Sequence, residues 1–356
     1  MGAKIIYAAI LILLCSSVLP SPTTASLADW ASWLGLPRLG GWQWPGNNNN
    51  GDDELRVGFY DYSCPQAENI IEDVVKAAIY NDPGIAAAFV RLYFHDCFVN
   101  GCDASILLDS TPSGEPTEKT SPGNLGVRGF EVIDEIKTRI EYVCPETVSC
   151  ADILSFATRD AVKHSGIPYY NVLAGRRDGQ TSVEKTILGN LPFPNANVKQ
   201  LDQIFTRKGM NKQDIVALLG AHSIGVAHCS VFEKQFNNFN STFDINPRLD
   251  KMYAMHLKKT CPLHKTSKDD VLPLNIYDQK RLSNVFYSNV INGKVIIPSD
   301  QSLLDDPKTN KLVHLYALEW STWVSDFRDS MIKLGKVDVL TGENGQIRKS
   351  CRAVNN

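Results

Sequence analysis

Apolar residues recur at helical spacing along most of the chain after residue 55. In the segment 67–80, the apolar positions Ile70, Ile71, Val74 and Ala78 fall on one helical face. The same spacing predicts helices over 85–94, 130–143, 151–164, 198–208, 212–219, 231–236, 247–259 and 312–333. Strand patterns are few and short, as over 169–174, and no repeat of fixed period is found. The pattern predicts a mainly α fold with long loops.

The first 25 residues have the composition of a signal peptide. Lys4 precedes an apolar run over 5–18 and the small-residue stretch PSPTTAS, so we expect cleavage near Ala25. The run is too short for a membrane anchor, and no later run of about twenty apolar residues follows. We therefore expect a secreted, extracellular protein with no membrane partner.

Residues 26–54 differ from the rest of the chain. They contain four tryptophans and the tract NNNNGDDE, without a helical or strand period. This composition predicts a flexible N-terminal extension, although so many tryptophans could also mark a contact surface. The folded domain is expected to span 55–356.

The cysteine count indicates disulfide bonds. Of nine cysteines, Cys15 lies in the signal peptide, which leaves eight in an oxidising compartment. These are Cys64, Cys97, Cys102, Cys144, Cys150, Cys229, Cys261 and Cys351. Eight cysteines allow 105 connectivities, and the count alone does not choose among them. A zinc site at Cys97 and Cys102 is disfavoured because no CxxC pair is present.

The overall composition of the chain is ordinary for a globular protein. The chain is 43% hydrophobic and 21% charged, with a net charge of -3, which suits one substantial core. It has no basic patch, so we expect no nucleic-acid partner. The sequon Asn240-Ser241-Thr242 is a candidate glycan site on a loop, the alternative being an unused surface asparagine.

The most informative residues are an arginine and two histidines. Arg91 and His95 lie four residues apart in RLYFHDCFVNGCDAS and so project from one helical face. A second histidine, His222, lies in GAHSIGVAHC. Taken alone, the first pair could be a surface pair and His222 a satisfied core residue. Together with the polar loop that follows His95, they suggest a haem held between two helices.

Over about residues 55–356, the chain resembles the class III plant secretory haem peroxidases. The motifs that carry the resemblance are GFYDYSCP, RLYFHDCFVNGCDASILL, GFEVIDEIK, CPETVSCADIL, GRRDG, NLPFP, GAHSIGVAHC, SDQ and GQIRKSC. The resemblance implies two all-helical lobes with haem b between them. It also implies disulfides that join Cys64 to Cys144, Cys97 to Cys102, Cys150 to Cys351 and Cys229 to Cys261.

Peroxide cleavage needs a base above the iron and a fixed positive charge near the departing oxygen. His95 is the expected base and Arg91 the expected cation, because guanidinium offers a fork that lysine lacks. The resemblance assigns Asn124 as the hydrogen-bond acceptor that orients His95, and a plain turn residue is the compatible alternative.

On the other side of the haem, the resemblance makes His222 the axial iron ligand and Asp300 its hydrogen-bond partner. Asp300 could otherwise be a helix cap. Phe94 and Phe98 are expected to wall the peroxide side. Pro192 in NLPFP is expected to contact the donor substrate, with a simple turn former as the alternative.

Calcium is the second expected cofactor. A distal site next to His95 is predicted from oxygen-rich residues, with Glu118 joining through water. Its expected members are Asp96, Val99, Gly101, Asp103, Ser105 and Glu118. For a proximal site, Ser223 matches the family pattern. The usual acidic loop is replaced by one with Asn275, Asp278 and Ser283, so its reduced charge predicts weak or rearranged binding.

The expected function is that of a secreted haem peroxidase of the cell wall or apoplast, monomeric, that reduces hydrogen peroxide and oxidises small phenolic donors in one-electron steps. It would act in cell-wall metabolism or the response to oxidative stress. A wall-binding protein with little turnover is the alternative of another class, but Arg91, His95 and His222 are all intact. An intracellular ascorbate-type peroxidase conflicts with the signal peptide and the eight cysteines.

Overall fold

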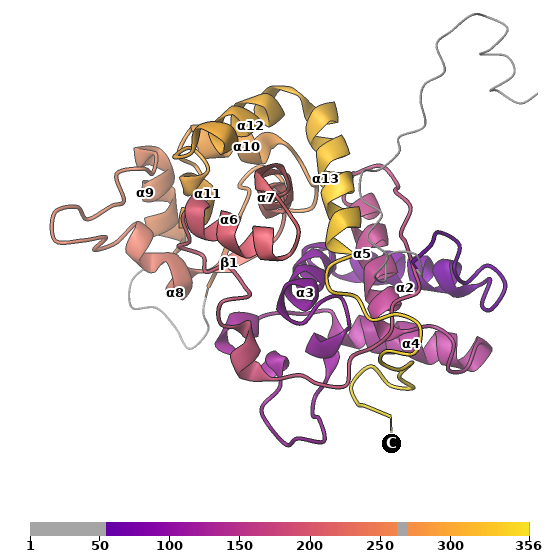
Figure 1. Cartoon of the computed structure of the whole chain (residues 1–356). Helices are drawn as coiled ribbons and strands as arrows, with labels where there is room; N and C mark the ends of the chain where they lie inside the picture. The colour runs from indigo at the N-terminus through magenta and orange to yellow at the C-terminus, as the bar shows by residue number, and fades with distance from the viewer. Residues whose placement is uncertain (1–54, 262–269, 356) are drawn as a thin grey trace, which may run out of the picture. The chain divides into compact units, whose positions relative to one another are not determined.

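The computed structural model describes residues 55–261 and 270–355, and these residues are mainly helical (Figure 1). The predicted signal peptide and the predicted extension over 26–54 lie outside the described residues. None of the helices within these described ranges is long and apolar enough to cross a membrane.

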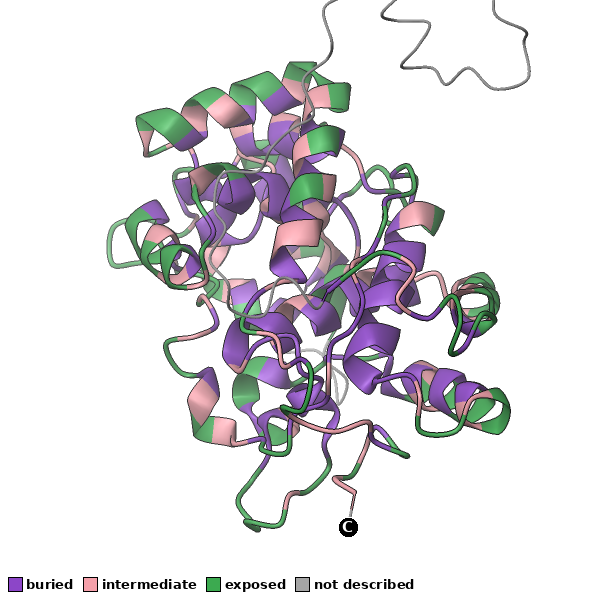
Figure 2. Cartoon of the chain, turned by 45° about the vertical axis from the view of Figure 1, so that its right-hand side comes forward, coloured by how far each residue is buried: buried purple, intermediate pink, exposed green. Residues whose placement is uncertain are grey.

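One group of helices packs around α5 (Cys150–His164), which contacts α2 (Ala67–Asn81), α3 (Ile85–Val99) and α4 (Phe130–Val143). Every residue of α5 from its start to Val162 is buried, so this helix forms the centre of the group. Figure 2 shows that buried residues gather in the interior of the described chain, whereas exposed residues lie on its outer helices and loops. Its first turn is capped by Ser149, whose side chain accepts a hydrogen bond from the Asp152 amide.

A second group of helices packs around α7 (Lys212–Leu219). It contains α6 (Val198–Arg207), α10 (Val285–Ile291), α12 (Pro307–Leu318) and α13 (Trp320–Leu334), and the short α11 (Pro298–Ser302) precedes α12. One hydrophobic core runs from Tyr60 to Cys351 and includes residues of both groups. The two groups correspond to the two lobes expected from the sequence.

A smaller core lies beside the second group. It is built from α8 (Cys229–Phe232), α9 (Lys251–Thr260) and a two-stranded antiparallel sheet. The sheet pairs β1 (Val226–His228) with β2 (Val271–Pro273), and Ala227 lies opposite Leu272. Short 3-10 helices occupy the loops: η2 (Ser105–Leu107), η3 (Glu118–Thr120), η4 (Pro122–Asn124), η5 (Glu184–Ile187), η6 (Gly220–Ser223) and η7 (Glu233–Gln235).

Most helices predicted from periodicity are present, with three corrections. The predicted strand over 169–174 is wrong, because only Ala174 forms a single bridge, with Arg56. The helix predicted over 312–333 is two helices, which meet at Glu319. Periodicity did not indicate this break, because apolar residues continue at helical spacing on both sides of it. The helix predicted over 231–236 is the end of α8 followed by η7.

All four expected disulfides are formed, which confirms the pairing implied by the resemblance. They are Cys64–Cys144, Cys97–Cys102, Cys150–Cys351 and Cys229–Cys261. The first ties the start of α2 to the end of α4, and the third closes a sequence separation of 201 residues. Each is expected to stabilise the fold by about 2 to 4 kcal/mol, mainly by restricting the unfolded chain.

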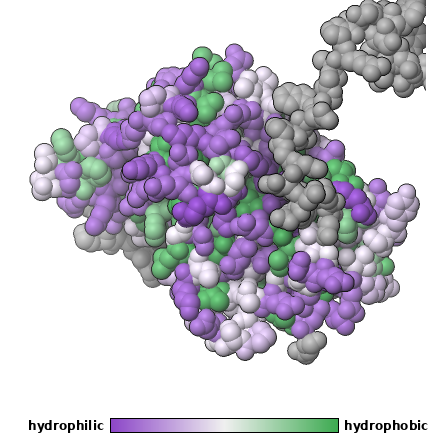
Figure 3. All heavy atoms as spheres, viewed as in Figure 1, coloured by the Kyte–Doolittle hydropathy of each residue, from purple (hydrophilic) through white to green (hydrophobic). Residues whose placement is uncertain are grey.

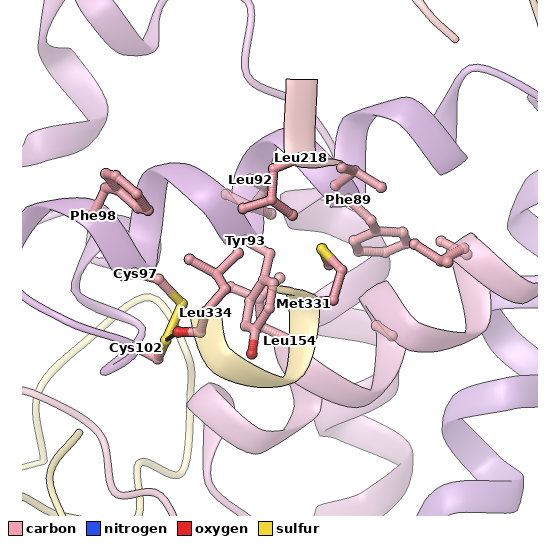
Figure 4. Close-up of a cluster of buried hydrophobic side chains, with 14 of the residues drawn as sticks. Phe89, Leu92, Tyr93, Cys97, Phe98, Cys102, Leu154, Leu218, Met331 and Leu334 are labelled. Carbon is pink, nitrogen blue, oxygen red and sulfur yellow. Dashed lines mark hydrogen bonds between the residues drawn. A yellow bond between two sulfur atoms is a disulfide. The ribbon is translucent and has the colours of Figure 1, made fainter. Parts of the chain in front are cut away.

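The side of α3 that carries Tyr93 is packed into the main core (Figure 4). Leu92, Tyr93 and Cys97 lie among buried residues that include Met331 and Leu334 of α13. The Tyr93 hydroxyl also shares a hydrogen bond of 3.0 Å with Ser155 of α5. Since α3 is fixed from this side, the residues on its other face keep a defined position.

A buried carboxylate also fixes the centre of the first group. Asp152 accepts hydrogen bonds from the Tyr60 hydroxyl at 2.8 Å, the Gly175 amide at 2.7 Å and Arg176 Nη1 at 2.7 Å. Arg176 in turn donates to the carbonyl of Gly335, directly after α13. Because both charges are paired and hydrogen-bonded, this network ties α5 to α13 without leaving a buried charge uncompensated.

Replacing Asn211, which caps α7, is expected to lower the free energy of unfolding by about 1 kcal/mol. Its Oδ1 accepts from the amides of Gln213 at 2.8 Å and Asp214 at 3.2 Å, and both lose their acceptor in Asn211→Ala. Denaturant unfolding of Asn211→Ala is compared with Asn211→Asp, which keeps the acceptor and serves as the control. Equal stability of the alanine variant and the parent would show that the cap contributes nothing.

Candidate active site

The candidate site begins on one face of α3. Arg91 is exposed and Phe94 and His95 are half-buried, whereas Leu92 and Tyr93, between them in sequence, are buried. Positions 91, 94 and 95 have the spacing of one helical face. α3 therefore presents a guanidinium, an aromatic ring and an imidazole together on its accessible side.

The orientation of His95 is set by Asn124. His95 Nδ1 lies 2.6 Å from Asn124 Oδ1, and Asn124 Nδ2 donates to the carbonyl of Glu118 at 2.8 Å. Since the amide nitrogen is used by that carbonyl, its oxygen faces the imidazole, and His95 Nδ1 must donate. The lone pair of His95 therefore lies on Nε2.

The electrostatic surroundings keep His95 neutral. Burial, together with the positive charge of Arg91, lowers the pKa of His95 to about 3, although the hydrogen bond with Asn124 opposes this shift. A neutral imidazole with a free nitrogen is a proton acceptor at neutral pH. Within the described part of the chain, Arg91 Nη2 donates to the Gly123 carbonyl alone, at 3.3 Å. Although the Arg91 side chain is exposed, partial desolvation by the surrounding protein lowers its pKa, and the guanidinium remains charged.

His222 is held by a carboxylate from a distant segment. It lies on η6, directly after α7, and its Nδ1 lies 2.9 Å from Asp300 Oδ1 of α11. Asp300 is buried, which raises its pKa, while the contact with His222 lowers it. Because Nδ1 faces a hydrogen-bond acceptor, Nε2 is the nitrogen left to bind a metal. The expectation that His222 lies on a regular helix is corrected to a 3-10 turn.

Gly220 allows the close packing behind this turn. A Cβ at Gly220 would lie 2.6 Å from Trp323 Nε1 and from the Tyr287 hydroxyl, so any side chain there would clash. The His222 ring also contacts Phe286 edge to face, with ring centroids 6.2 Å apart. Sequence reasoning did not assign Phe286 or Gly220 to the site. The motif GAHSIG was the only signal that pointed to this turn.

Aromatic rings line the neighbouring part of α3. Phe94 stacks on Phe98 with centroids 4.1 Å apart, and Phe205 of α6 contacts Phe98 at 4.7 Å and Phe94 at 6.1 Å. Phe205 joins the two helix groups here and was not predicted from the sequence. The cluster forms an apolar wall one helical turn from Arg91 and His95.

The segments that carry the two histidines border one another. A Cβ at Gly225, three residues after His222, would lie 3.0 Å from the Cβ of Ala87 on α3. A Cβ at Gly126, two residues after Asn124, would lie 3.6 Å from His228 Nε2. The loop of Asn124 and the strand β1 therefore face each other beside the candidate site.

Pro192 lies in a loop close to this region. The loop follows η5, whose Ile187 Cγ2 would lie 3.2 Å from a Cβ placed at Gly123. Pro192 is half-buried, and its neighbour Phe193 is 58% exposed. The structure thus brings the end of η5, five residues before Pro192, beside the loop of Asn124.

Oxygen atoms gather after His95. Asp96 accepts from the amides of Ala104 at 3.0 Å and Ile106 at 3.5 Å, and Asp103 accepts from the Ser105 amide at 2.9 Å. The third carboxylate is that of Glu118, and all three are buried.

Burial raises the pKa of all three carboxyl groups, that of Glu118 to about 8, and repulsion from a neighbouring carboxylate adds to each shift: Asp103 acts on Asp96 and on Glu118, and Asp178 acts on Asp103. Among the residues that the structure describes, two buried oxygens, Ser105 Oγ and Glu118 Oε2, have no partner in hydrogen-bond geometry, although the nearby Ser105 hydroxyl lowers the pKa of Asp103 and Glu118 somewhat. Nowhere in the described ranges do three or more His, Cys, Asp or Glu side chains alone form a metal centre. A cation at this cluster would therefore also need hydroxyl or carbonyl ligands, such as Ser105 and the backbone of Val99 and Gly101.

The candidate proximal loop is arranged differently, because its polar side chains bond to nearby backbone. Ser223 Oγ accepts from the Ser283 amide at 3.0 Å, and Asn275 Oδ1 accepts from the Tyr277 amide at 3.1 Å. Asp278 is exposed and accepts from the Lys280 amide at 2.9 Å. No buried carboxylate faces Ser223 in the contacts of this loop that the structure describes.

Comparison with known proteins identifies the class. The sequence model of the family described as Peroxidase matches residues 71–319, which include His95, Asn124, His222 and Asp300. The chain belongs to the peroxidase family, whose members use haem to reduce hydrogen peroxide at the expense of a donor.

Its plant relatives are similar over most of the chain. Peroxidase 5 of Vitis vinifera and Peroxidase 66 of Arabidopsis thaliana are each 44% identical, over 85% of this chain and 92% of their own length. Peroxidase 9 of Arabidopsis thaliana is 40% identical over 96% of this chain and 99% of its own length. These values place the chain among the class III plant peroxidases and make it an oxidoreductase.

Proposed function

We propose that His95, Arg91 and Asn124 form the peroxide-cleaving side of a haem site, and that His222 with Asp300 forms the iron-binding side. The observation that carries this proposal is the matching orientation of the two histidines. Each contacts a fixed acceptor through Nδ1, so each has Nε2 available. His95 bonds to the amide of Asn124 and stays a neutral base, whereas His222 bonds to the carboxylate of Asp300, which suits a metal ligand.

The donor set fits haem b. His222 Nε2 would bind the iron, and the rings of Phe94 and Phe98 would contact the peroxide side of the macrocycle. The haem, when bound, supplies the redox chemistry that removes electrons from a donor and delivers them to peroxide.

The side chains supply proton transfer and charge. His95 Nε2 would take a proton from one oxygen of the peroxide and return it to the other oxygen, which departs as water. Asn124 keeps Nδ1 protonated, so the imidazole presents the same nitrogen in both steps. Arg91, which makes one long hydrogen bond to Gly123 among the described residues, has donors left to stabilise negative charge on the departing oxygen.

Small phenols are the proposed donors. The loops beside the site expose apolar side chains, with Leu125 at 68%, Leu188 at 72% and Phe193 at 58%. Such side chains favour aromatic molecules over ions or sugars, and Pro192 lies next to Phe193. A donor held there would give up single electrons to the haem edge without entering the wall formed by Phe94, Phe98 and Phe205.

The proposed location is the extracellular space of the cell wall or apoplast. All eight cysteines of the region 55–356 are paired in disulfides, as expected of a protein that matures under oxidising conditions. Residues 1–25 would be removed as a signal peptide, and residues 26–54 would precede the peroxidase domain. Asn240, exposed on a loop, would be available for glycosylation, and the protein would act as a monomer.

Calcium is proposed for the distal cluster. The two partnerless oxygens of Ser105 and Glu118, beside two further buried carboxylates, form a donor set whose repulsion a divalent cation would relieve. The proximal loop does not fit a second calcium as well. Asn275 and Ser283 provide no charge, and the one carboxylate, Asp278, is turned to solvent.

One calcium per chain is therefore the expected result of metal analysis by mass spectrometry on the dialysed protein. Asp103→Asn should lower this content towards zero, because it removes a buried anionic ligand. The double variant Asn275→Asp with Ser283→Asp should raise it towards two, by restoring charge around Ser223. Two calcium ions in the parent protein would contradict the assignment of the proximal loop.

The proposed function is tested by stopped-flow absorption of the haem-loaded protein mixed with stoichiometric hydrogen peroxide. A fast decrease and shift of the Soret band, reversed in two steps by a phenol, is the expected result. A Soret band that does not respond to peroxide would reject the roles of the residues above and favour a wall-binding protein without turnover.

A further inference from the structure

A continuous series of aromatic rings leads away from His222. Phe286 contacts the His222 ring, and Tyr287 contacts Phe286 with centroids 5.0 Å apart. Tyr316 of α12 follows Tyr287 at 5.2 Å, and Trp323 of α13 forms a branch at 5.9 Å. These four aromatic residues are buried, so the series lies within the second helix group.

Tyr316, at the end of the series, differs from Tyr287 and Trp323 in the group that accepts its hydrogen bond. The Tyr316 hydroxyl donates to Asp326 Oδ2 at 2.5 Å, a carboxylate that can accept a proton. In contrast, the Tyr287 hydroxyl donates to the Val216 carbonyl at 2.8 Å, and Trp323 Nε1 donates to the Ala217 carbonyl at 3.1 Å. A backbone carbonyl does not accept a proton outright.

This difference determines where an oxidised side chain would be stable. A tyrosine that loses an electron becomes a strong acid and is stabilised when its proton moves to a base. Among the three oxidisable residues of the series, only Tyr316 donates to such a base. Asp326 is half-buried and so reaches solvent at the surface of α13.

We propose that Tyr316, a buried residue with the half-buried Asp326 as its proton acceptor, is a second oxidation site that takes electrons from donors at the protein surface and is linked to the haem through Tyr287, Phe286 and His222. The proposal rests on the proposed role of His222 as the iron ligand. It assigns Tyr316 and Asp326 a function beyond packing, namely oxidation of phenols too large to reach the haem edge, such as phenolic polymers.

Each turnover of Tyr316 would move one electron and one proton out and then back. Peroxide reduction leaves the haem short of electrons, and one electron moves from Tyr316 along the rings to the haem while the phenolic proton moves to Asp326. An external phenol then gives one electron to the tyrosyl radical, and Asp326 returns the proton. The external phenol loses its own proton to solvent and leaves as a phenoxyl radical.

The surface around this end of the series suits an aromatic donor. Leu318 is 83% exposed at the end of α12, and Trp320 is 41% exposed at the start of α13. Figure 3 shows a mainly hydrophilic surface with dispersed apolar groups, so exposed apolar side chains are limited in extent on that face. The two residues flank the turn at Glu319, on the helices that carry Tyr316 and Asp326.

The test is electron paramagnetic resonance on the haem-loaded protein, frozen shortly after mixing with one equivalent of hydrogen peroxide. The parent and Tyr170→Phe, which removes a buried tyrosine outside the series, should both show a tyrosyl radical signal. Tyr316→Phe should lose this signal, and Asp326→Asn should lose most of it although every ring is retained. A signal that survives in Tyr316→Phe would overturn the proposal.

A second readout compares two donors, a free phenol and the same phenol attached to a large polyethylene glycol. The ratio of polymer-bound to free phenol oxidation should fall in Tyr316→Phe and stay unchanged in Tyr170→Phe. An unchanged ratio in Tyr316→Phe would overturn the role of Tyr316 in oxidising donors at the surface. If the Soret band of the parent responds to peroxide but no tyrosyl radical forms, the series is only core packing and the proposed function stands. If the Soret band does not respond, both proposals fail.

Discussion

His95→Ala is expected to slow the reaction of the haem-loaded protein with hydrogen peroxide by about 10² to 10⁴-fold, the usual contribution of a positioned general base. His95 is the group whose free Nε2 lies on the accessible face of α3, and its neutral state is set by burial and by Arg91. With alanine, the accessible face of α3, which otherwise carries Arg91 and Phe94, has no side chain that can take the peroxide proton. The rate of the Soret change after mixing with peroxide measures the effect directly.

The control for this variant is His256→Ala, which removes an exposed histidine on α9 and should leave the rate unchanged. Asn124→Ala should give an intermediate loss, because His95 remains but its Nδ1 acceptor is gone. A His95→Ala protein that reacts at the parental rate would exclude His95 as the base. A larger loss in Asn124→Ala than in His95→Ala would mean that Asn124 acts through the loop rather than through the imidazole.

Arg91→Leu should lower the same rate by about 10² to 10³-fold, the effect of removing one donor aimed at developing negative charge. The leucine side chain is close in length to the arginine stem, so the change removes the charge without opening a large gap. Arg91→Lys should recover only part of the rate, because an ammonium group lacks the planar fork of guanidinium. Arg139→Leu, an exposed arginine of α4 paired with Glu135, serves as the control.

The two Arg91 variants separate charge from geometry. If lysine restored the full rate, a point charge alone would be sufficient and the fork would have no role. If leucine had no effect, the negative charge would be stabilised by other groups, and the position of Arg91 on the face of His95 would be incidental. Soret spectra before peroxide addition show whether each variant still holds haem in the same environment.

The local features of this protein were predictable from its sequence. Helices such as Phe130–Val143 and Lys212–Leu219 have the bounds predicted from apolar spacing, because a helix is determined by residues within a few positions of one another. The chemistry of Arg91 and His95 was also visible, since i and i+4 positions share a face wherever the helix lies. The break between α12 and α13 was missed, because both helices bury the same kind of face on either side of Glu319.

Other features depended on the resemblance to a family. The spacing of eight cysteines allowed 105 pairings, and the motifs selected the four that the structure contains. The pairs His95 with Asn124 and His222 with Asp300 were likewise implied by motifs, the second across 78 residues. No periodicity connects residues so far apart in the chain.

The sequence by itself determined the helical class, the oxidising compartment implied by its cysteines and the kinds of side chain available for peroxide chemistry. Only the tertiary structure decided which imidazole nitrogens are available, that Phe205 joins the wall formed by Phe94 and Phe98, and that Tyr316 meets Asp326. The physical reason is that composition and periodicity report the preferences of neighbouring residues. Hydrogen-bond direction, burial and ring contacts arise when distant segments pack, and they are set by shape and charge in three dimensions.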